Sequence, residues 1–145
     1  IGMADPQALV QANAAKDAYQ FLGSPEGELA IAQSVVYLAT APKSNAAYKA
    51  FKLSAKAARK YGSSMPPKHI LNAPTGLMKE LGYGKDYAYD HDAEGGFSGQ
   101  NYFPEDMERQ EFYQPVPRGF ERDIAKRLDY WAGWRKKRQK EGDTG

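Results

Sequence analysis

The apolar residues of the first 62 positions constrain the fold most, because they follow the period of an α-helix in three successive segments. The first segment opens with Asp5 and Pro6, which favour a helix start, and closes at Gly23, which favours a helix end. Apolar residues then recur at spacings of four and three, at Ala8, Ala12, Ala15, Tyr19 and Leu22. This spacing predicts one buried helical face.

The second segment has similar boundaries, with Ser24 and Pro25 at its start and Pro42 at its end. Its apolar residues fall on most sides of the predicted helix, at Leu29, Ile31, Ala32, Val35, Val36, Leu38 and Ala39. A helix that is apolar on most sides is usually central in its domain. We therefore expect this helix to be buried.

The third predicted helix is capped by Ser44 and closed by Gly62. Its predicted buried stripe consists of Ala47, Phe51, Ala55 and Ala58. A second face carries the basic residues Lys49, Lys52, Lys56 and Arg59 at spacings of three and four. Small alanines on the apolar stripe indicate a close approach to a neighbouring helix.

Residues 62–117 form a long connector that holds seven of the 14 glycines and six of the nine prolines. One short helix is predicted from Pro74 to Leu81, and short extended pieces at 86–90 and 111–115. A long loop rich in aromatic residues is expected to be ordered, because such side chains bury large areas. The candidates for contact with another subunit are Tyr83, Tyr87, Tyr89, Phe97, Tyr102 and Phe103.

The last predicted helix covers 118–142 and packs back through Phe120, Ile124, Leu128 and Trp131. The fold class is therefore all-α, with a long ordered aromatic, glycine- and proline-rich connector before the last helix. At 145 residues we expect one domain, 1–145, in which 129–145 are a basic helix end and a frayed tail. Apolar runs fall short of the roughly 20 residues that span a bilayer, so no membrane partner is expected.

The charges are separated along the chain although the net charge is only +2. No acidic residue occurs between Leu29 and Lys79, whereas 86–111 holds eight carboxylates. The basic helix faces could be solvated, could meet an acidic protein surface, or could contact nucleic-acid phosphates. The candidate contact residues for DNA or an acidic partner are Lys49, Lys52, Lys56, Arg59, Arg135, Lys136, Lys137 and Arg138.

Two short motifs invite a chemical interpretation. Gly84-Lys85 lacks the first glycine of a phosphate-binding loop, because Lys79 occupies that position, so we interpret Gly82 and Gly84 as a helix end and a turn. The sequence 90–92 is Asp-His-Asp, and the only other histidine is His69. A metal site needs ligands that converge from several places, so we expect the histidine ring to tie down the loop instead. No catalytic, cofactor or metal residues are assigned.

Several strings resemble one family: ADPQAL, ELAIAQSVVYLATAPKSNAAY, HILNAPTGLMKELGYGKDYAYDHD and GGFSGQNYFPE. They are similar to the C-terminal region of the replication-associated recombination protein A (MgsA/RarA) AAA+ ATPases, which resemble the Werner-helicase-interacting ATPase. The resemblance covers about 1–128 and fades from Asp129 onward. The start at Ile1 fits a piece cut from a longer protein.

The resemblance implies an ATPase of the clamp-loader clade that acts at stalled replication forks. ATP and magnesium are expected in an N-terminal module outside these residues, so this chain is not expected to be an enzyme. The family's helical C-terminal region resembles a clamp-loader collar and assembles a homotetramer. The implied partners are further copies of the chain, DNA and single-strand-binding protein. The implied localisation is cytoplasmic, in association with the nucleoid. The main expectation is thus an oligomerisation module, and the alternative is a nucleic-acid-binding module.

Overall fold

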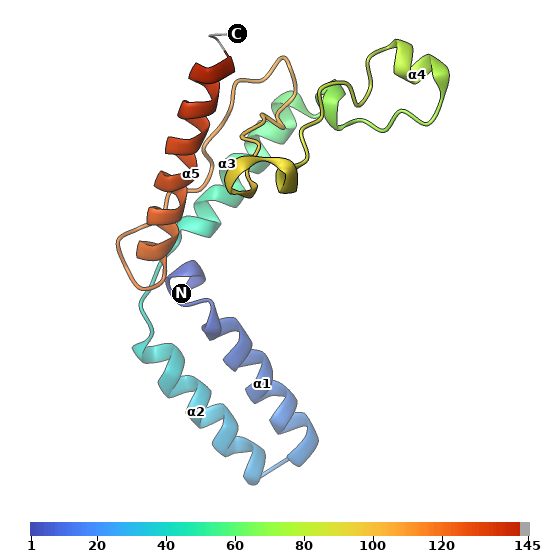
Figure 1. Ribbon diagram of the computed structural model, residues 1–145. Coiled ribbons are helices and arrows are strands. Elements are labelled where there is room, and N and C mark those ends of the chain that lie inside the picture. The colour runs from blue at the N-terminus through green and yellow to red at the C-terminus, as the bar shows by residue number, and fades with distance from the viewer. Residues whose placement is uncertain (143–145) are drawn as a thin grey trace. The chain divides into compact units, whose positions relative to one another are not determined.

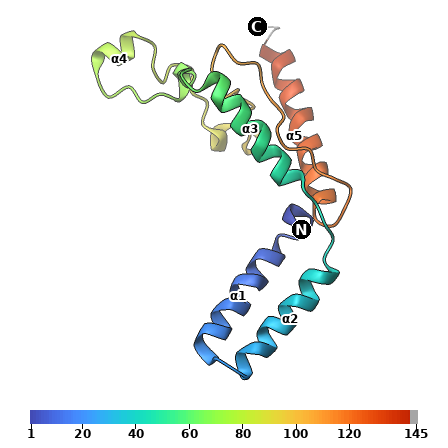
Figure 2. The ribbon, with the colours of Figure 1, turned by 180° about the vertical axis from the view of Figure 1, so that it is seen from behind.

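The computed structural model describes residues 1–142, and every regular element in that part of the chain is helical (Figures 1 and 2), as the all-α prediction requires. The α-helices are α1 (Gln7–Leu22), α2 (Glu26–Thr40), α3 (Ala46–Tyr61), α4 (Gly76–Glu80) and α5 (Glu121–Gly142). Short 3₁₀ turns are η1 (Gly2–Ala4), η2 (Lys68–Ile70), η3 (Asp90–Asp92) and η4 (Glu94–Gly96). The predicted fraying of the tail concerns residues 143–145, which lie outside the described residues. No described helix has the length and apolar character needed to cross a membrane.

Local capping signals set several helix boundaries as predicted, but the predicted Ser24 cap of α2 is wrong, because the Ser24 hydroxyl donates to the Glu28 carboxylate at 2.6 Å instead. The Asp5 carboxylate accepts a hydrogen bond from the Gln7 amide at 3.0 Å, and Gly23 ends α1 at a φ of 70°. The Ser44 hydroxyl accepts from the Ala46 amide at 3.1 Å at the start of α3. The short helix α4 is confirmed with narrower bounds than predicted, because the Thr75 hydroxyl caps it.

The chain divides into two compact units. The first holds residues 1–54 and 112–126, and the second holds residues 55–111 and the part of α5 from Arg127 on.

In the first unit, α1 and α2 run antiparallel as a helical hairpin (Figure 1). Small residues form the buried seam between them, namely Ala8, Ala15, Gly27 and Ser34. A Cβ atom placed on Gly27 would lie 2.7 Å from the Tyr19 Cα, which is closer than side-chain carbons normally approach a backbone. The seam therefore requires glycine at this position.

A buried carboxylate fixes the beginning of α5 in the first unit. Glu121 is fully buried and accepts hydrogen bonds from the Ser44 hydroxyl at 2.9 Å, the Tyr113 hydroxyl at 2.8 Å and the Val116 amide at 2.8 Å. Burial alone would raise the pKa of the Glu121 carboxyl, but these donors lower the pKa overall. Burial, together with the hydrogen bond to Glu121, raises the pKa of Tyr113 to about 12.

In the second unit, the connector segment 94–99 lies against the C-terminal half of α5. The Phe97 ring packs on the Trp131 ring with centroids 4.6 Å apart, and the Arg138 guanidinium donates to the Glu94 carbonyl at 3.1 Å. This contact confirms that aromatic packing orders part of the connector. Of the residues predicted to pack the last helix back, Trp131 makes this contact, whereas Leu128 is 42% exposed.

Side chains rather than strands hold the rest of the connector. The Gln100 amide group donates to the Asp86 carbonyl at 2.7 Å and accepts from the Ala88 amide at 3.1 Å. The predicted extended pieces at 86–90 and 111–115 form no strand in the structure as described. Backbone groups of 86–90 bond to the Gln100 side chain and to turns instead.

Candidate functional site

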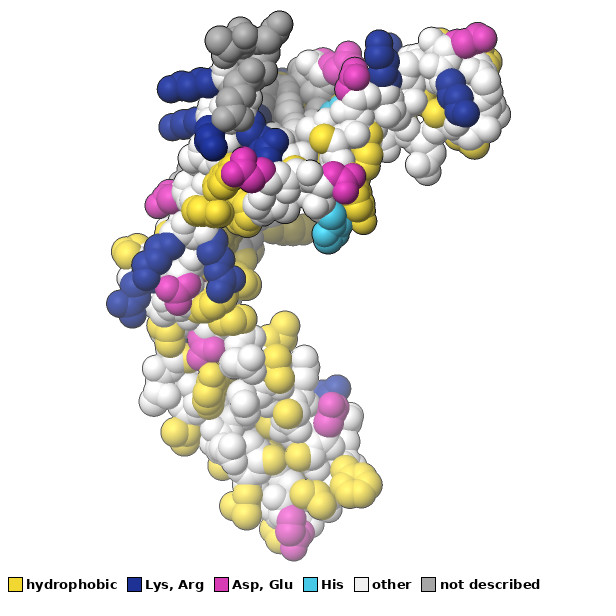
Figure 3. Space-filling model, in the orientation of Figure 1, with side chains coloured by type: hydrophobic (Ala, Val, Ile, Leu, Met, Phe, Trp, Pro, Cys, Tyr) yellow, Lys and Arg dark blue, Asp and Glu magenta, His cyan; other side chains and the backbone are white. Residues whose placement is uncertain are grey.

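The α1–α2 hairpin exposes its large apolar side chains, because the small residues occupy its seam. The exposed large residues of the hairpin are Leu9, Val10, Tyr19, Phe21, Leu22, Leu29, Ile31, Val35 and Val36. Phe21, at the end of α1, is 89% exposed. Figure 3 shows yellow hydrophobic side chains over the visible face of this hairpin. Apolar patches of this kind mark interaction surfaces.

Helix α2 carries the most regular part of this surface. Leu29, Ala32, Val36 and Ala39 recur at spacings of three, four and three, and all four are exposed. They lie on the side of α2 opposite Gly27 and Ser34, the residues buried toward α1. We call these four residues the α2 stripe.

The prediction that α2 is central in its domain is wrong for the single chain, because Leu29 is 73% and Val36 64% exposed. Sequence reasoning treated all apolar residues of α2 alike and so missed the stripe. The signal that could have separated its two faces is the pair Gly27 and Ser34, seven residues apart, since small residues permit close helix packing.

The predicted buried stripe of α3 is also wrong. Phe51 is 71% exposed, and Ala47 and Ala58 are exposed with it. The face turned inward is instead the one with Ala46, Ala50, Ser54 and Ala57. Small residues again line the less exposed side, which leaves the larger apolar side chain outside. The close approach of a neighbouring helix that these alanines predicted is not found in the described residues, where the extensive helix pairing is that of α1 with α2.

The basic face of α3 is present as predicted. Lys49, Lys52, Lys56 and Arg59 are all exposed and follow one side of the helix. The Lys52 ammonium lies 4.5 Å from the centre of the Tyr48 ring. The ion pairs found among the described side chains join Lys16 to Asp17 and Lys126 to Asp123, so none of them neutralises this face.

The basic end of α5 is partly used within the chain. The Arg135 guanidinium lies 5.2 Å from the centre of the Phe97 ring, and Arg138 binds the Glu94 carbonyl. Burial lowers the pKa of Arg135, and the nearby Arg109 adds to this effect while Glu111 opposes it. Arg135 and Arg138 thus fasten the connector, whereas Lys136 is exposed and the Lys137 ammonium lies 5.1 Å from the Trp134 ring.

The aromatic candidates of the connector fall into two groups. Tyr83, Phe97 and Phe103 are partly buried within the second unit. Tyr87, Tyr89 and Tyr102 are about half exposed. The second group leaves ring surface available to a partner.

The Asp90-His91-Asp92 turn is held by an aspartate rather than by the histidine. The Asp90 carboxylate accepts from the Ser98 amide at 2.8 Å, and its hydrogen bonds to Ser98 lower the pKa of that carboxyl. His91 is exposed and packs beside the Tyr89 ring with centroids 5.0 Å apart. Within the described residues, no group of three or more His, Cys, Asp or Glu could hold a metal ion.

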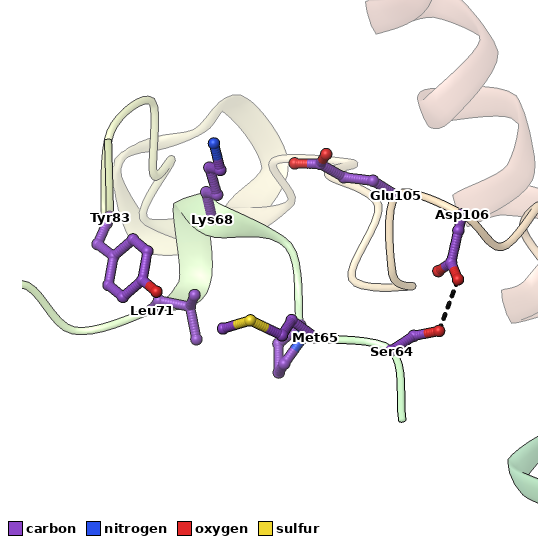
Figure 4. Close-up of a pocket in the computed structure, with 8 residues that line it drawn as sticks. Ser64, Met65, Lys68, Leu71, Tyr83, Glu105 and Asp106 are labelled. Atoms are coloured by element: carbon purple, nitrogen blue, oxygen red, sulfur yellow. Dashed lines mark hydrogen bonds between the residues drawn. The ribbon is translucent and has the colours of Figure 1, made fainter. Parts of the chain in front are cut away.

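A small cavity of about 240 Å³ lies in the second unit (Figure 4). The Met65 side chain extends toward Leu71 and Tyr83, which give the cavity an apolar side. The Asp106 carboxylate accepts from the Ser64 hydroxyl at 2.6 Å, so this acid already serves to join two connector segments. The arrangement supports the loop and presents no assembled acid–base pair.

Comparison with known proteins identifies the family. A sequence model described as MgsA AAA+ ATPase C terminal matches residues 1–132. Replication-associated recombination protein A of Coxiella burnetii is 50% identical over 132 residues, which are 90% of this chain and 30% of the relative. The protein of that name from Escherichia coli strain K12 is 47% identical over 133 residues, 91% of this chain and 30% of the relative.

A eukaryotic relative matches a similar region. ATPase WRNIP1 of Dictyostelium discoideum is 40% identical over 119 residues, which are 79% of this chain and 13% of that protein. The chain spans about 30% of the length of the two bacterial relatives. The family resemblance deduced from the sequence strings is thereby confirmed, and the chain belongs to the C-terminal region of the MgsA family of replication-associated recombination AAA+ ATPases.

Proposed function

We propose that this chain is the self-association module of its AAA+ ATPase and holds copies of the longer protein together as a homotetramer. The observation that carries the proposal is the exposed apolar surface of the α1–α2 hairpin, which includes Phe21, Leu29 and Val36. A single chain cannot bury this surface while its small residues occupy the seam.

The energetics of this surface favour association. A large apolar side chain gains about 1.5–3 kcal/mol when it moves from full exposure to full burial. Association costs about 4–15 kcal/mol in lost translational and rotational freedom. Burial of most of the nine large exposed residues would therefore give a gain comparable to that cost or larger than it.

The longer protein would supply the chemistry. We assign ATP and magnesium binding to the part outside these residues, since the relatives are about three times as long as the matched region. In this scheme the present chain arranges the ATPase modules and does not hydrolyse ATP itself.

Light scattering on the 145-residue chain at tens of micromolar tests the proposal. We expect a tetramer, and a shift toward monomer when Leu29 and Val36 are both changed to Glu. Leu77→Glu is the matched control, because Leu77 is similarly exposed at 66% but lies on α4. A wild-type chain that is strictly monomeric over this concentration range would overturn the proposal.

A second candidate function is nucleic-acid binding by the basic face of α3. It is favoured by four exposed cations on one side of α3, one of which, Lys52, lies beside the aromatic Tyr48, an arrangement suited to phosphates and stacked bases. DNA is the proposed ligand, and single-strand-binding protein is a further proposed partner of the longer protein.

Fluorescence anisotropy with labelled single-stranded DNA tests this candidate. We expect affinity to fall steeply with salt, and to fall further in the variant Lys52→Glu, Lys56→Glu. Lys16→Glu is the control, because Lys16 is exposed on α1 and already lies 3.1 Å from Asp17. Failure to bind at low salt would exclude single-stranded DNA as a ligand of this chain.

A further inference from the structure

The side chains of the α2 stripe are complementary in size to the same stripe running in the opposite direction. Along α2 the sizes alternate between large and small, as Leu29, Ala32, Val36 and Ala39. In an antiparallel pair of α2 helices centred on position 34, Leu29 of one copy faces Ala39 of the other. Ala32 then faces Val36, so that each large side chain meets a small one.

We infer that α2 packs antiparallel against α2 of a second copy, about a two-fold axis that passes at the level of residue 34. This inference rests on the proposed self-association and specifies one of its interfaces. A two-fold contact uses the same patch on both copies, so the patch must be complementary to itself. The alternation along the stripe meets that requirement.

The charges at the two ends of α2 select the antiparallel direction. Glu26 and Glu28 lie in the first turn. The Lys43 ammonium lies at the other end, where it donates to the Leu38 carbonyl at 2.7 Å. An antiparallel pair places the acidic end of each helix beside Lys43 of the other copy and opposes the two helix dipoles. A parallel pair would place like charges together at both ends.

The interior of the stripe is free of charge, which suits burial. Leu29, Ala32, Val36 and Ala39 are the residues turned away from Gly27 and Ser34, so α1 of the same chain does not cover them. Small alanines between the larger side chains allow close approach of the two helix axes, as at the seam with α1.

Disulfide trapping tests the register directly, because the chain contains no cysteine. Chains carrying Ala32→Cys and Val36→Cys are coexpressed with different tags and exposed to mild oxidation. We expect mixed disulfide dimers, since a disulfide needs Cα atoms within about 4.4–6.8 Å and these positions face each other. Leu29→Cys with Ala39→Cys is a second pair, which keeps the test valid if one variant folds poorly.

Cross-linking of each single cysteine variant with itself is the control for the mixed pair. Two copies of Val36→Cys would be offset by about 6 Å along the helices, given a rise of 1.5 Å per residue, and should cross-link at least tenfold less than the mixed pair. Leu77→Cys on α4 measures the amount of cross-linking that random collision produces. Circular dichroism confirms that each variant is helical.

The outcomes separate this inference from the proposed function. Mixed dimers that exceed both the single variants and Leu77→Cys support antiparallel α2 pairing. Cross-linking of Val36→Cys with itself above the mixed pair overturns the antiparallel register centred on residue 34. A tetrameric wild type whose cysteine variants form no mixed disulfide at either pair also overturns it while leaving self-association intact. A monomeric wild type overturns both.

Discussion

The Ser44 hydroxyl donates a hydrogen bond to the Glu121 carboxylate at 2.9 Å across 77 positions of sequence. The same hydroxyl accepts from the Ala46 amide and so caps α3. One serine thereby joins the start of α3 to the start of α5, and both starts depend on a carboxylate that no solvent reaches.

Glu121→Gln should lower the free energy of unfolding by about 2 kcal/mol, because hydrogen bonds to a charged acceptor contribute about 1.5–3 kcal/mol. Urea denaturation followed by circular dichroism measures the change. Asp123→Asn, on the exposed surface of the same helix turn, is the control and should change stability by less than about 0.5 kcal/mol. Equal effects of the two substitutions would show that the buried carboxylate has no special role.

The contribution of Glu121 should also depend on pH. Its pKa in the folded chain is lowered, so the carboxylate stabilises the fold fully above its unfolded pKa of about 4.3. That stability is lost as pH falls through the folded pKa. The stability difference between wild type and Glu121→Gln should therefore be constant from pH 6 to 7 and should shrink below pH 4. A difference that persists unchanged at pH 2.5 would contradict this mechanism.

At alkaline pH the stability of the fold should depend on Tyr113, whose pKa is raised to about 12. A raised folded pKa means that the neutral phenol stabilises the fold below its unfolded pKa of about 10, and that this stability is lost as pH rises toward 12. Melting temperatures measured from pH 9 to 12 should fall less steeply in Tyr113→Phe than in wild type. The same slope in both chains would assign the alkaline loss to other groups.

Helix boundaries were predictable because neighbouring residues determine them. Gly23 and Ser44 act through backbone groups within a few positions, and the structure places them at the ends of helices as predicted, whereas the Thr75 cap of α4 was not predicted. The length of the chain between Ser44 and Glu121 explains why their hydrogen bond was not predicted, since no local pattern relates them.

The buried face of a helix was harder to predict than its boundaries. Hydrophobicity alone favoured Phe51 over Ala50, yet Ala50 is the more buried residue. In the seam between α1 and α2, close packing of backbones selects small side chains, and the large apolar ones then lie on the outer surface. In the candidate site, the basic face of α3 was visible in the sequence, whereas the use of Arg135 to fasten Phe97 required the tertiary fold.

Phe97→Ala should loosen the connector without unfolding the first unit. The ring packs on Trp131 and under Arg135, and its removal takes away about 2 kcal/mol or more of apolar burial and ring contact. Hydrogen exchange should speed up for residues 94–99 and stay unchanged in α1 and α2. Tyr87→Ala is the control, because that ring is half exposed. Faster exchange throughout the chain would contradict a local anchoring role.

Two glycine substitutions should have opposite effects. At Gly27 an added methyl would meet the Tyr19 Cα at 2.7 Å, and because the obstacle is backbone, Gly27→Ala should destabilise the hairpin by about 1–3 kcal/mol. Gly133 lies inside α5 with no atom within 4 Å of an added Cβ, so Gly133→Ala should stabilise that helix by about 0.5–1 kcal/mol. Urea denaturation of both variants measures the signs. Because the two changes are chemically identical, opposite signs can only come from the packing around each glycine, and a stabilised Gly27→Ala would contradict the close seam between α1 and α2.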